Sequence, residues 1–178
     1  MKIVYCIAGT YNSGGMERVL ANKANYLAGH GYEVVIITTD QRGNRPFFDL
    51  DGRIRCHDLG INYEKNNGKS FLNKLICYPF KQWKHRKRLS ECLKRINADI
   101  TVSMFCNDAS LLWKMNDSSR KILEIHFSRY KRLQYGRKGI WKLVDWGKSR
   151  MDERTVKRYD RFVVLTAEDQ SYWGDLPN

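Results

Sequence analysis

The sequence predicts an α/β fold, a Rossmann-like doubly wound parallel sheet built as one domain of 178 residues. Continuous apolar runs of strand length recur along the chain, as expected of strands that are covered on both faces. These runs alternate with longer amphipathic segments, which is the pattern of strands and crossover helices. A loop of small residues joins the first apolar run to the first amphipathic segment. No internal repeat interrupts this order, and the length suits a single domain.

The first forty residues give the clearest unit. Residues 3–8 form an apolar run that predicts a buried parallel strand. A loop over 9–15 follows, and residues 16–28 place their apolar side chains on one helical stripe. Residues 33–39 then predict a second buried strand. Strand, helix and strand in this order form a βαβ unit, whose crossover is expected to be right-handed.

Four further strands and four further helices are expected in the rest of the chain. The strands are predicted at 53–59, 99–105, 121–126 and 161–165, the first being the most exposed. The helices are predicted at 71–95, from the cap at 107–108 through 115, at 138–157 and at 167–173. We expect Pro79 to begin or kink a helix, Met151 to face inward, and Thr166 to cap the last helix.

Positive charge is concentrated in two segments. The chain has 32 Lys and Arg against 19 Asp and Glu, a net charge of +13, which excludes an acidic solvating protein and favours an anionic partner. Residues 63–95 contain ten basic and two acidic residues, and residues 129–161 contain twelve and four. The remaining residues are slightly acidic overall, so the basic character belongs to these two segments.

The first basic segment interleaves aromatic and basic side chains on a predicted helix. This pattern suits an anionic membrane surface, and it also fits a solvated helix whose apolar stripe packs on the sheet, or a nucleic-acid-binding face. The membrane-surface candidates are Lys74, Lys81, Trp83, Lys84, Arg86, Lys87 and Arg88. The second segment leaves the same alternatives open. No zinc finger, RNA-binding motif or helix-turn-helix accompanies either segment.

The cysteines indicate a reducing compartment. Five cysteines without C-x-x-C spacing argue against a disulfide framework and against a zinc ribbon. Cys56 and His57 are adjacent but have no second pair at ligand spacing, so we expect no metal site. No stretch has the length of a transmembrane helix. We therefore predict a cytoplasmic protein, with peripheral attachment to the inner face of the membrane as the alternative location.

Gly14 and Gly15, between the first strand and the first helix, form the most informative local feature. At the carboxyl end of a strand in such a sheet, a loop of this kind lines the ligand crevice, and the free amides of the helix favour a diphosphate. The simpler interpretation is a turn that needs glycine dihedral angles. The loop matches neither the Walker motif nor the Gly-x-Gly-x-x-Gly motif. Asp40, after the second strand, leaves a dinucleotide-binding enzyme as an alternative interpretation.

Four stretches together resemble retaining family-4 glycosyltransferases. Gly14-Gly15-Met16-Glu17-Arg18 resembles their Gly-Gly-x-Glu-Arg loop, and residues 19–34 resemble the helix that follows it. Residues 121–126 are similar to the family's strand that ends in histidine. Residues 159–166 resemble its last amino-terminal strand, with Tyr159 and Thr166 in place of the common alanine and serine. Residues 40–95 match no motif of the family.

The resemblance implies the amino-terminal, acceptor-side half of a GT-B architecture, spanning 1–178. It implies that His126 faces the transferring sugar as the catalytic position, and that Gly14 and Gly15 close on the donor diphosphate. Glu17 and Arg18 would take part in donor or acceptor binding. The pair of glutamates eight positions apart that marks the family's donor-binding domain is missing from this sequence. We therefore expect a carboxy-terminal donor domain outside this chain, and no turnover by this chain alone.

The implied reaction is transfer of a sugar, of hexosyl type, from a nucleotide-sugar to a glycan or lipid-linked acceptor with retention of configuration. Surface polysaccharide or glycoconjugate synthesis is the expected setting, and no cofactor or metal is expected. The competing interpretation is a stand-alone basic α/β domain that binds nucleic acid or another polyanion, which the charge alone supports.

Overall fold

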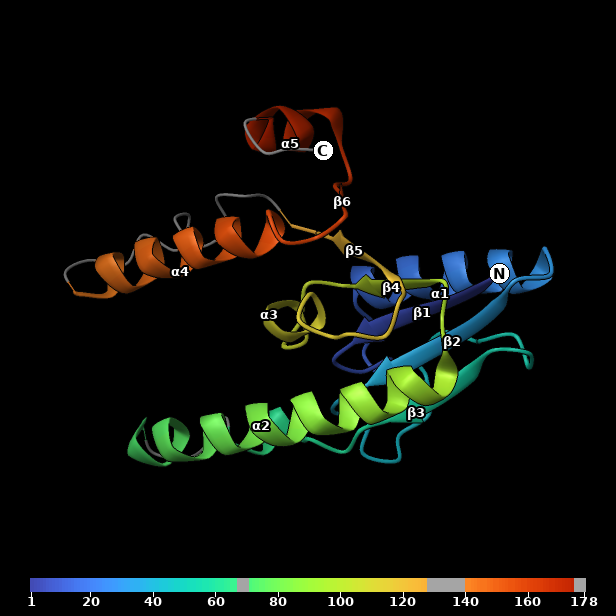
Figure 1. The fold of residues 1–178 in the computed structure, drawn as a ribbon, viewed down its shortest axis with the longest axis horizontal. Coiled ribbons are helices and arrows are strands. Elements are labelled where there is room, and N and C mark those ends of the chain that lie inside the picture. The colour runs from blue at the N-terminus through green and yellow to red at the C-terminus, as the bar shows by residue number, and fades with distance from the viewer. Residues whose placement is uncertain (67–70, 128–139, 175–178) are drawn as a thin grey trace.

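Six parallel strands form the sheet at the centre of the molecule (Figure 1). The computed structural model describes residues 1–66, 71–127 and 140–174. The strands are β1 (Lys2–Ile7), β2 (Glu33–Thr38), β3 (Arg55–Asp58), β4 (Ile100–Ser103), β5 (Arg120–Glu124) and β6 (Arg161–Val163). Their order, β3-β2-β1-β4-β5-β6, steps outward from β1 in both directions. The predicted doubly wound sheet and all six predicted strands are confirmed.

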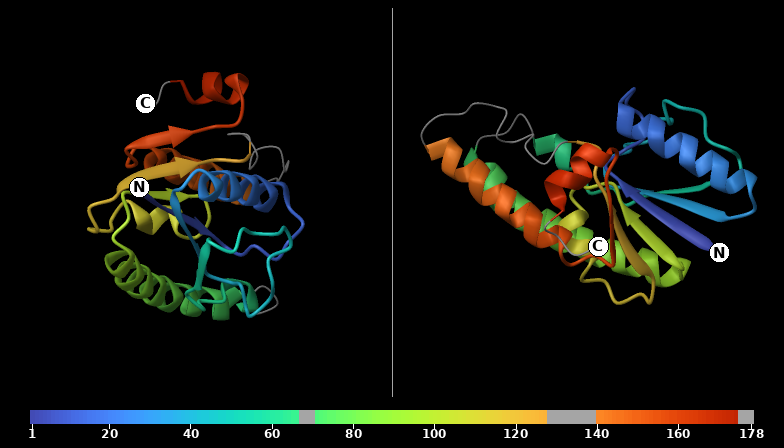
Figure 2. Two further views of the ribbon diagram at one scale, coloured as in Figure 1. Left: turned by 90° about the vertical axis from the view of Figure 1, so that its right-hand side faces the viewer. Right: turned by 90° about the horizontal axis from the view of Figure 1, so that it is seen from above.

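Helices connect the strands and cover both faces of the sheet (Figure 2). They are α1 (Gly15–Gly29), the short 3₁₀-helix η1 (Tyr63–Asn66), α2 (Phe71–Ile96), α3 (Ala109–Leu112), α4 (Ile140–Val156) and α5 (Ala167–Trp173). The predicted cap of α5 is confirmed, because the Thr166 hydroxyl accepts a hydrogen bond from the Asp169 amide at 3.0 Å.

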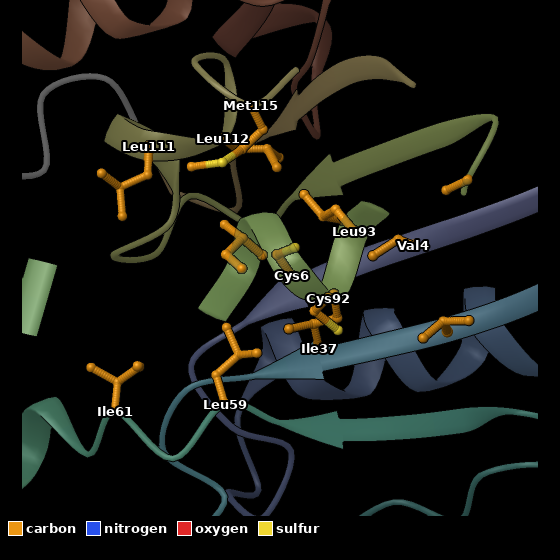
Figure 3. Close-up of a cluster of buried hydrophobic side chains, with 13 residues drawn as sticks. Val4, Cys6, Ile37, Leu59, Ile61, Cys92, Leu93, Leu111, Leu112 and Met115 are labelled. Carbon is orange, nitrogen blue, oxygen red and sulfur yellow. The ribbon is translucent and has the colours of Figure 1, made fainter. Parts of the chain in front are cut away.

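The alternating side chains of the strands build two core layers. Val4 and Cys6 of β1 face α2 and α3, together with Ile37, Leu89 and Leu112 (Figure 3). The intervening residues of β1 point to the opposite face and pack against α1. Because both faces are covered, β1 and β2 are apolar over most of their length, which makes them recognisable as continuous apolar runs.

The structure corrects one sequence-based expectation about the helices and half of another, since Pro79 was expected either to begin or to kink a helix and only the first alternative is excluded. Pro79 does not begin α2, since the helix starts at Phe71 and runs through the proline. Pro79 is exposed, so water can satisfy the backbone carbonyl that its missing N–H would otherwise bind. Met151 of α4 is 64% exposed and does not face the core.

Helices α2 and α4 flank the carboxyl edge of the sheet. Both extend beyond the ends of the strands on the same side of the molecule, as Figures 1 and 2 show. The space at the edge is therefore bounded by a helix on either side. Within the residues described, no helix combines the length and apolarity needed to cross a bilayer.

Candidate functional site

A cleft of about 670 Å³ lies at the carboxyl edge of the sheet, between α2, α3 and α4. Open parallel sheets bind their ligands at this edge, where the loops that follow the strands converge. Ala8 after β1, the segment 105–107 after β4, and Phe127 after β5 all contribute to the lining. Tyr78 of α2 and Lys148 of α4 close the two sides.

The cleft combines an apolar surface with hydrogen-bonding groups. The rings of Phe105 and Phe127 pack edge to face with their centroids 5.3 Å apart. Asn107, Ser110 and Thr155 add amide and hydroxyl groups to the same lining. This mixture suits a polar ligand with apolar ring faces, because the aromatic side chains supply contact area and the polar groups fix orientation.

The acidic and thiol groups beside the cleft are electrostatically constrained. Burial raises the pKa of Asp108, at the start of α3, to about 6, although a hydrogen bond from Ser103 acts in the opposite direction. Burial, together with the nearby Asp108 carboxylate, raises the pKa of the Cys106 thiol to about 12. Cys106 is therefore present as the thiol at neutral pH and is not an activated nucleophile.

Gly14 and Gly15 occupy different environments at the start of α1. Gly14 is the extended N-cap residue, and a Cβ atom there would overlap the carboxylate of Glu17, which folds back over it. At Gly15 a Cβ atom would meet nothing within 4 Å. As the N-cap residue, Gly14 makes no side-chain capping bond to the amino end of α1. The first amides of the helix therefore remain available to a ligand.

Arg18, the last residue of the glycine-loop motif, stacks on a neighbouring loop. Its guanidinium carbon lies 5.2 Å from the centre of the Phe48 ring. The residue remains exposed on the first turn of α1. Arg18 thus sits next to Gly14 and Gly15, as the motif implies, with its side chain directed toward the segment that follows β2.

His126 lies two residues beyond β5 and is turned toward the α1 face of the sheet. Its Nε2 atom is 2.9 Å from Oε1 of Glu124, and the Lys23 ammonium of α1 donates to the same oxygen at 2.5 Å. The side chains of His126 and Glu124 are only 6% and 4% exposed. Phe127, the next residue, lines the cleft instead, so the side chains of these two consecutive residues lie on opposite faces of the sheet.

The Glu124 carboxylate is held in its ionised form. Burial raises the pKa of this group, but hydrogen bonds from His126 and Lys23 and the charge of Lys23 more than offset it. The net pKa lies below the ordinary value. Glu124 is therefore charged at neutral pH, and its contribution to stability is lost only as the pH falls through that lowered pKa.

Three of the membrane-surface candidates on α2 are engaged by the chain itself. Lys81, Lys84 and Arg88 donate to the backbone carbonyls of Asn62, Gly60 and Leu59, respectively. Their spacing places them on one side of α2, where they hold the segment between β3 and η1.

Trp83, Arg86 and Lys87 are instead exposed on α2. Trp83 stacks with Phe80 at 6.0 Å between ring centroids, and the Lys87 ammonium lies 5.8 Å from the Trp83 ring. The side chain of Lys74 lies outside the described part of the structure.

Asp40 is the residue on which the alternative of a dinucleotide-binding enzyme rests, and it is not available to bind a ribose. The residue is 1% exposed. One carboxylate oxygen accepts from the Thr39 hydroxyl at 2.7 Å, and the other accepts from the Glu64 amide at 3.0 Å. The carboxylate thus serves as an internal acceptor that fixes the segment around η1.

Sequence reasoning missed the residues that line the cleft. Phe105 ends a predicted strand, and Asn107 and Phe127 lie within two residues of the ends of predicted strands, where the carboxyl ends of parallel strands meet at one edge. That rule could have found them. Lys148 and Thr155 carry no comparable signal, because their place in the cleft depends on how α4 packs against the sheet.

Comparison with known proteins identifies the family. The family profile described as Glycosyltransferase Family 4 matches residues 13–176. A protein of Haemophilus influenzae (strain ATCC 51907 / DSM 11121 / KW20 / Rd), described as an uncharacterized glycosyltransferase, is 33% identical over 184 aligned residues. That alignment covers 98% of this chain and 43% of the relative.

Two solved structures show the same fold. Sucrose-phosphate synthase (tll1590) from Thermosynechococcus elongatus superposes with a TM-score of 0.68 at 13% identity, over 96% of this chain and 44% of that one. The apo form of the lipopolysaccharide outer core galactosyltransferase WaaB superposes with a TM-score of 0.57 at 16% identity, over 98% and 43%. The predicted Rossmann-like half of a GT-B architecture is confirmed. The chain spans less than half the length of each of these proteins, and it belongs to glycosyltransferase family 4.

Proposed function

We propose that this chain is the acceptor-side domain of an enzyme that transfers a hexosyl group from a nucleotide-sugar to an acceptor hydroxyl with retention of configuration. Membership of glycosyltransferase family 4 supports sugar transfer as the reaction. The single observation that carries the acceptor role is the cleft of about 670 Å³ at the carboxyl edge, with its paired Phe105 and Phe127 rings and its amide and hydroxyl groups. A saccharide presents hydroxyl groups and apolar ring faces, which this lining complements.

The same geometry separates a donor side from an acceptor side at the carboxyl edge of the sheet. The α1 side of the edge carries Gly14, Gly15 and His126, which we assign to the donor sugar and diphosphate. The cleft on the other side takes the acceptor, which we propose to be a glycan or a lipid-linked glycan in surface polysaccharide or glycoconjugate synthesis. The donor nucleotide is bound mainly by a domain outside this chain, and neither a cofactor nor a metal ion is required.

A donor screen tests this function. The complete native protein is incubated with separate UDP-, GDP-, ADP- and CMP-linked sugars and with an extract of the source cells' glycolipids and oligosaccharides as acceptors. We expect transfer from one hexosyl donor, with the donor's anomeric configuration kept in the product as read by NMR. The chain of 178 residues is the matched control and is expected to transfer nothing. Absence of transfer by the complete protein with every donor would contradict the proposal.

We further assign the exposed stripe of α2 to an anionic membrane surface. Phe80 and Trp83 are 65% and 60% exposed, and Arg86 and Lys87 lie beside them. Lys81, Lys84 and Arg88 are held by backbone carbonyls on another side of the helix, whereas the side chains of this stripe are free to meet lipid headgroups. A lipid-linked acceptor would then reach the cleft from the same surface.

Vesicle flotation tests the membrane contact. Replacing Phe80 and Trp83 with serine removes about 3 kcal/mol of transfer free energy, so we expect more than a tenfold loss of chain recovered with anionic vesicles. Phe47, 58% exposed and distant from α2 in sequence, provides the control variant Phe47→Ser. Equal recovery of the wild-type chain with anionic and zwitterionic vesicles would show that anionic headgroups do not attract α2, and would contradict this contact.

A further inference from the structure

One nitrogen of the His126 ring is enclosed by the protein. Nε2 is buried and lies 2.9 Å from Oε1 of Glu124, a distance that suits an ion pair, although the ring N–H direction is not aligned with that oxygen for a full hydrogen bond. The 6% of the side chain that solvent reaches therefore belongs to other atoms of the residue. We assign the other ring nitrogen, Nδ1, to a ligand that approaches from the carboxyl edge.

The charge of Glu124 determines which nitrogen carries the proton. An ionised carboxylate can only accept hydrogen bonds, and a neutral imidazole has one donor nitrogen and one acceptor nitrogen. Glu124 is ionised at neutral pH, so the proton of the neutral ring belongs on Nε2. Nδ1 then carries a lone pair and is a hydrogen-bond acceptor.

Lys23 completes the arrangement from α1. Its ammonium donates to the same Glu124 oxygen at 2.5 Å, and its own side chain is 42% exposed while that of Glu124 is 4% exposed. The carboxylate is thus anchored between a helix and the residue that follows the strand end. A buried carboxylate in this position restricts rotation of the histidine ring.

We propose that Glu124 is a positioning residue, which with Lys23 holds His126 so that Nδ1 accepts a hydrogen bond from a hydroxyl of the transferring sugar. The sugar contact rests on the function proposed above, whereas the orientation of the ring does not. Glu124 acts through His126 and does not itself touch the sugar.

Ring-proton NMR on the 178-residue chain tests the orientation. An imidazole N–H is visible only when it is shielded from exchange with water, so we expect a resonance at Nε2 of His126 in the wild type, identified by its loss in His126→Asn. The resonance should persist in Glu124→Gln, whose amide oxygen still accepts, and disappear in Glu124→Leu. Glu33→Leu removes an exposed strand glutamate and is the matched control. A wild-type proton on Nδ1, or a resonance unchanged in Glu124→Leu, overturns the proposal.

Kinetics of the complete protein test the sugar contact separately. We expect kcat/KM to fall roughly 10- to 100-fold in Glu124→Leu, as for other groups that orient a functional histidine, and to recover to within a few-fold in Glu124→Gln. Wild-type kcat/KM in Glu124→Leu would overturn the positioning role even if the ring proton behaves as expected. Absence of transfer by the wild-type protein would instead overturn the proposed function, and the NMR result would still decide the ring orientation.

Discussion

Replacing Asp117 with alanine is expected to lower the free energy of unfolding of this chain by about 3–5 kcal/mol. Asp117 and Lys121 form an ion pair in which the two side chains are only 2% and 8% exposed. The Lys121 ammonium also donates to the hydroxyl of Ser119 at 2.6 Å and to its carbonyl at 3.2 Å. Without Asp117, the lysine charge on β5 stays buried with neutral partners alone, which is the costly case.

Urea unfolding followed by circular dichroism measures this effect. The double variant Asp117→Ala, Lys121→Met removes the charge together with its partner and is expected to recover most of the loss. The exposed pair of Asp51 and Arg53 supplies the comparison, since Asp51→Ala should leave the unfolding midpoint nearly unchanged. A loss below about 1 kcal/mol in Asp117→Ala would show that water reaches Lys121 in solution.

Replacing Gly15 with alanine is expected to lower sugar transfer by the complete protein at least ~100-fold, the effect of displacing a bound substrate by about 1 Å. The variant should not disturb the free domain, because a Cβ atom at Gly15 meets nothing within 4 Å. Alanine is also the better helix former, by up to ~1 kcal/mol. The added methyl group would occupy the space in which the proposed diphosphate approaches the amino end of α1.

The control for this variant lies at the other end of the same helix. Gly29 is likewise helical and open, so Gly29→Ala should keep both stability and transfer. Transfer rates of the two variants are compared in the donor screen, and melting temperatures are measured on the 178-residue chain. Unchanged transfer by Gly15→Ala would mean that the donor does not approach the backbone at this position.

The fold was predictable because its determinants are local. A strand covered on both faces is largely apolar, and such runs mark β1 and β2 in the sequence itself. The helices were harder to delimit. Pro79 is tolerated inside α2 and Met151 is exposed, and both facts depend on which parts of a helix meet the core.

The candidate site was predictable in part. His126 was expected at a strand end, and Glu124, two residues earlier, had to share its face because strand side chains alternate. The contact with Lys23 could not be foreseen, since it depends on the rotation of α1 over β5. Likewise, the composition of α2 predicts Lys81, Lys84 and Arg88 as surface charges. In the structure they donate hydrogen bonds to backbone carbonyls, and no sequence pattern reveals those contacts.

The two outer strands of the sheet differ in how they resist the addition of a foreign strand. All four residues of β3 are exposed, and they include Arg55, His57 and Asp58, so a second chain pairing there would have to desolvate charged groups. At β6, by contrast, Val163 and the following Leu165 are 38% and 52% exposed, and no further described strand pairs with its outer side. Self-association of this chain by edge-to-edge pairing is therefore favoured at β6 and disfavoured at β3.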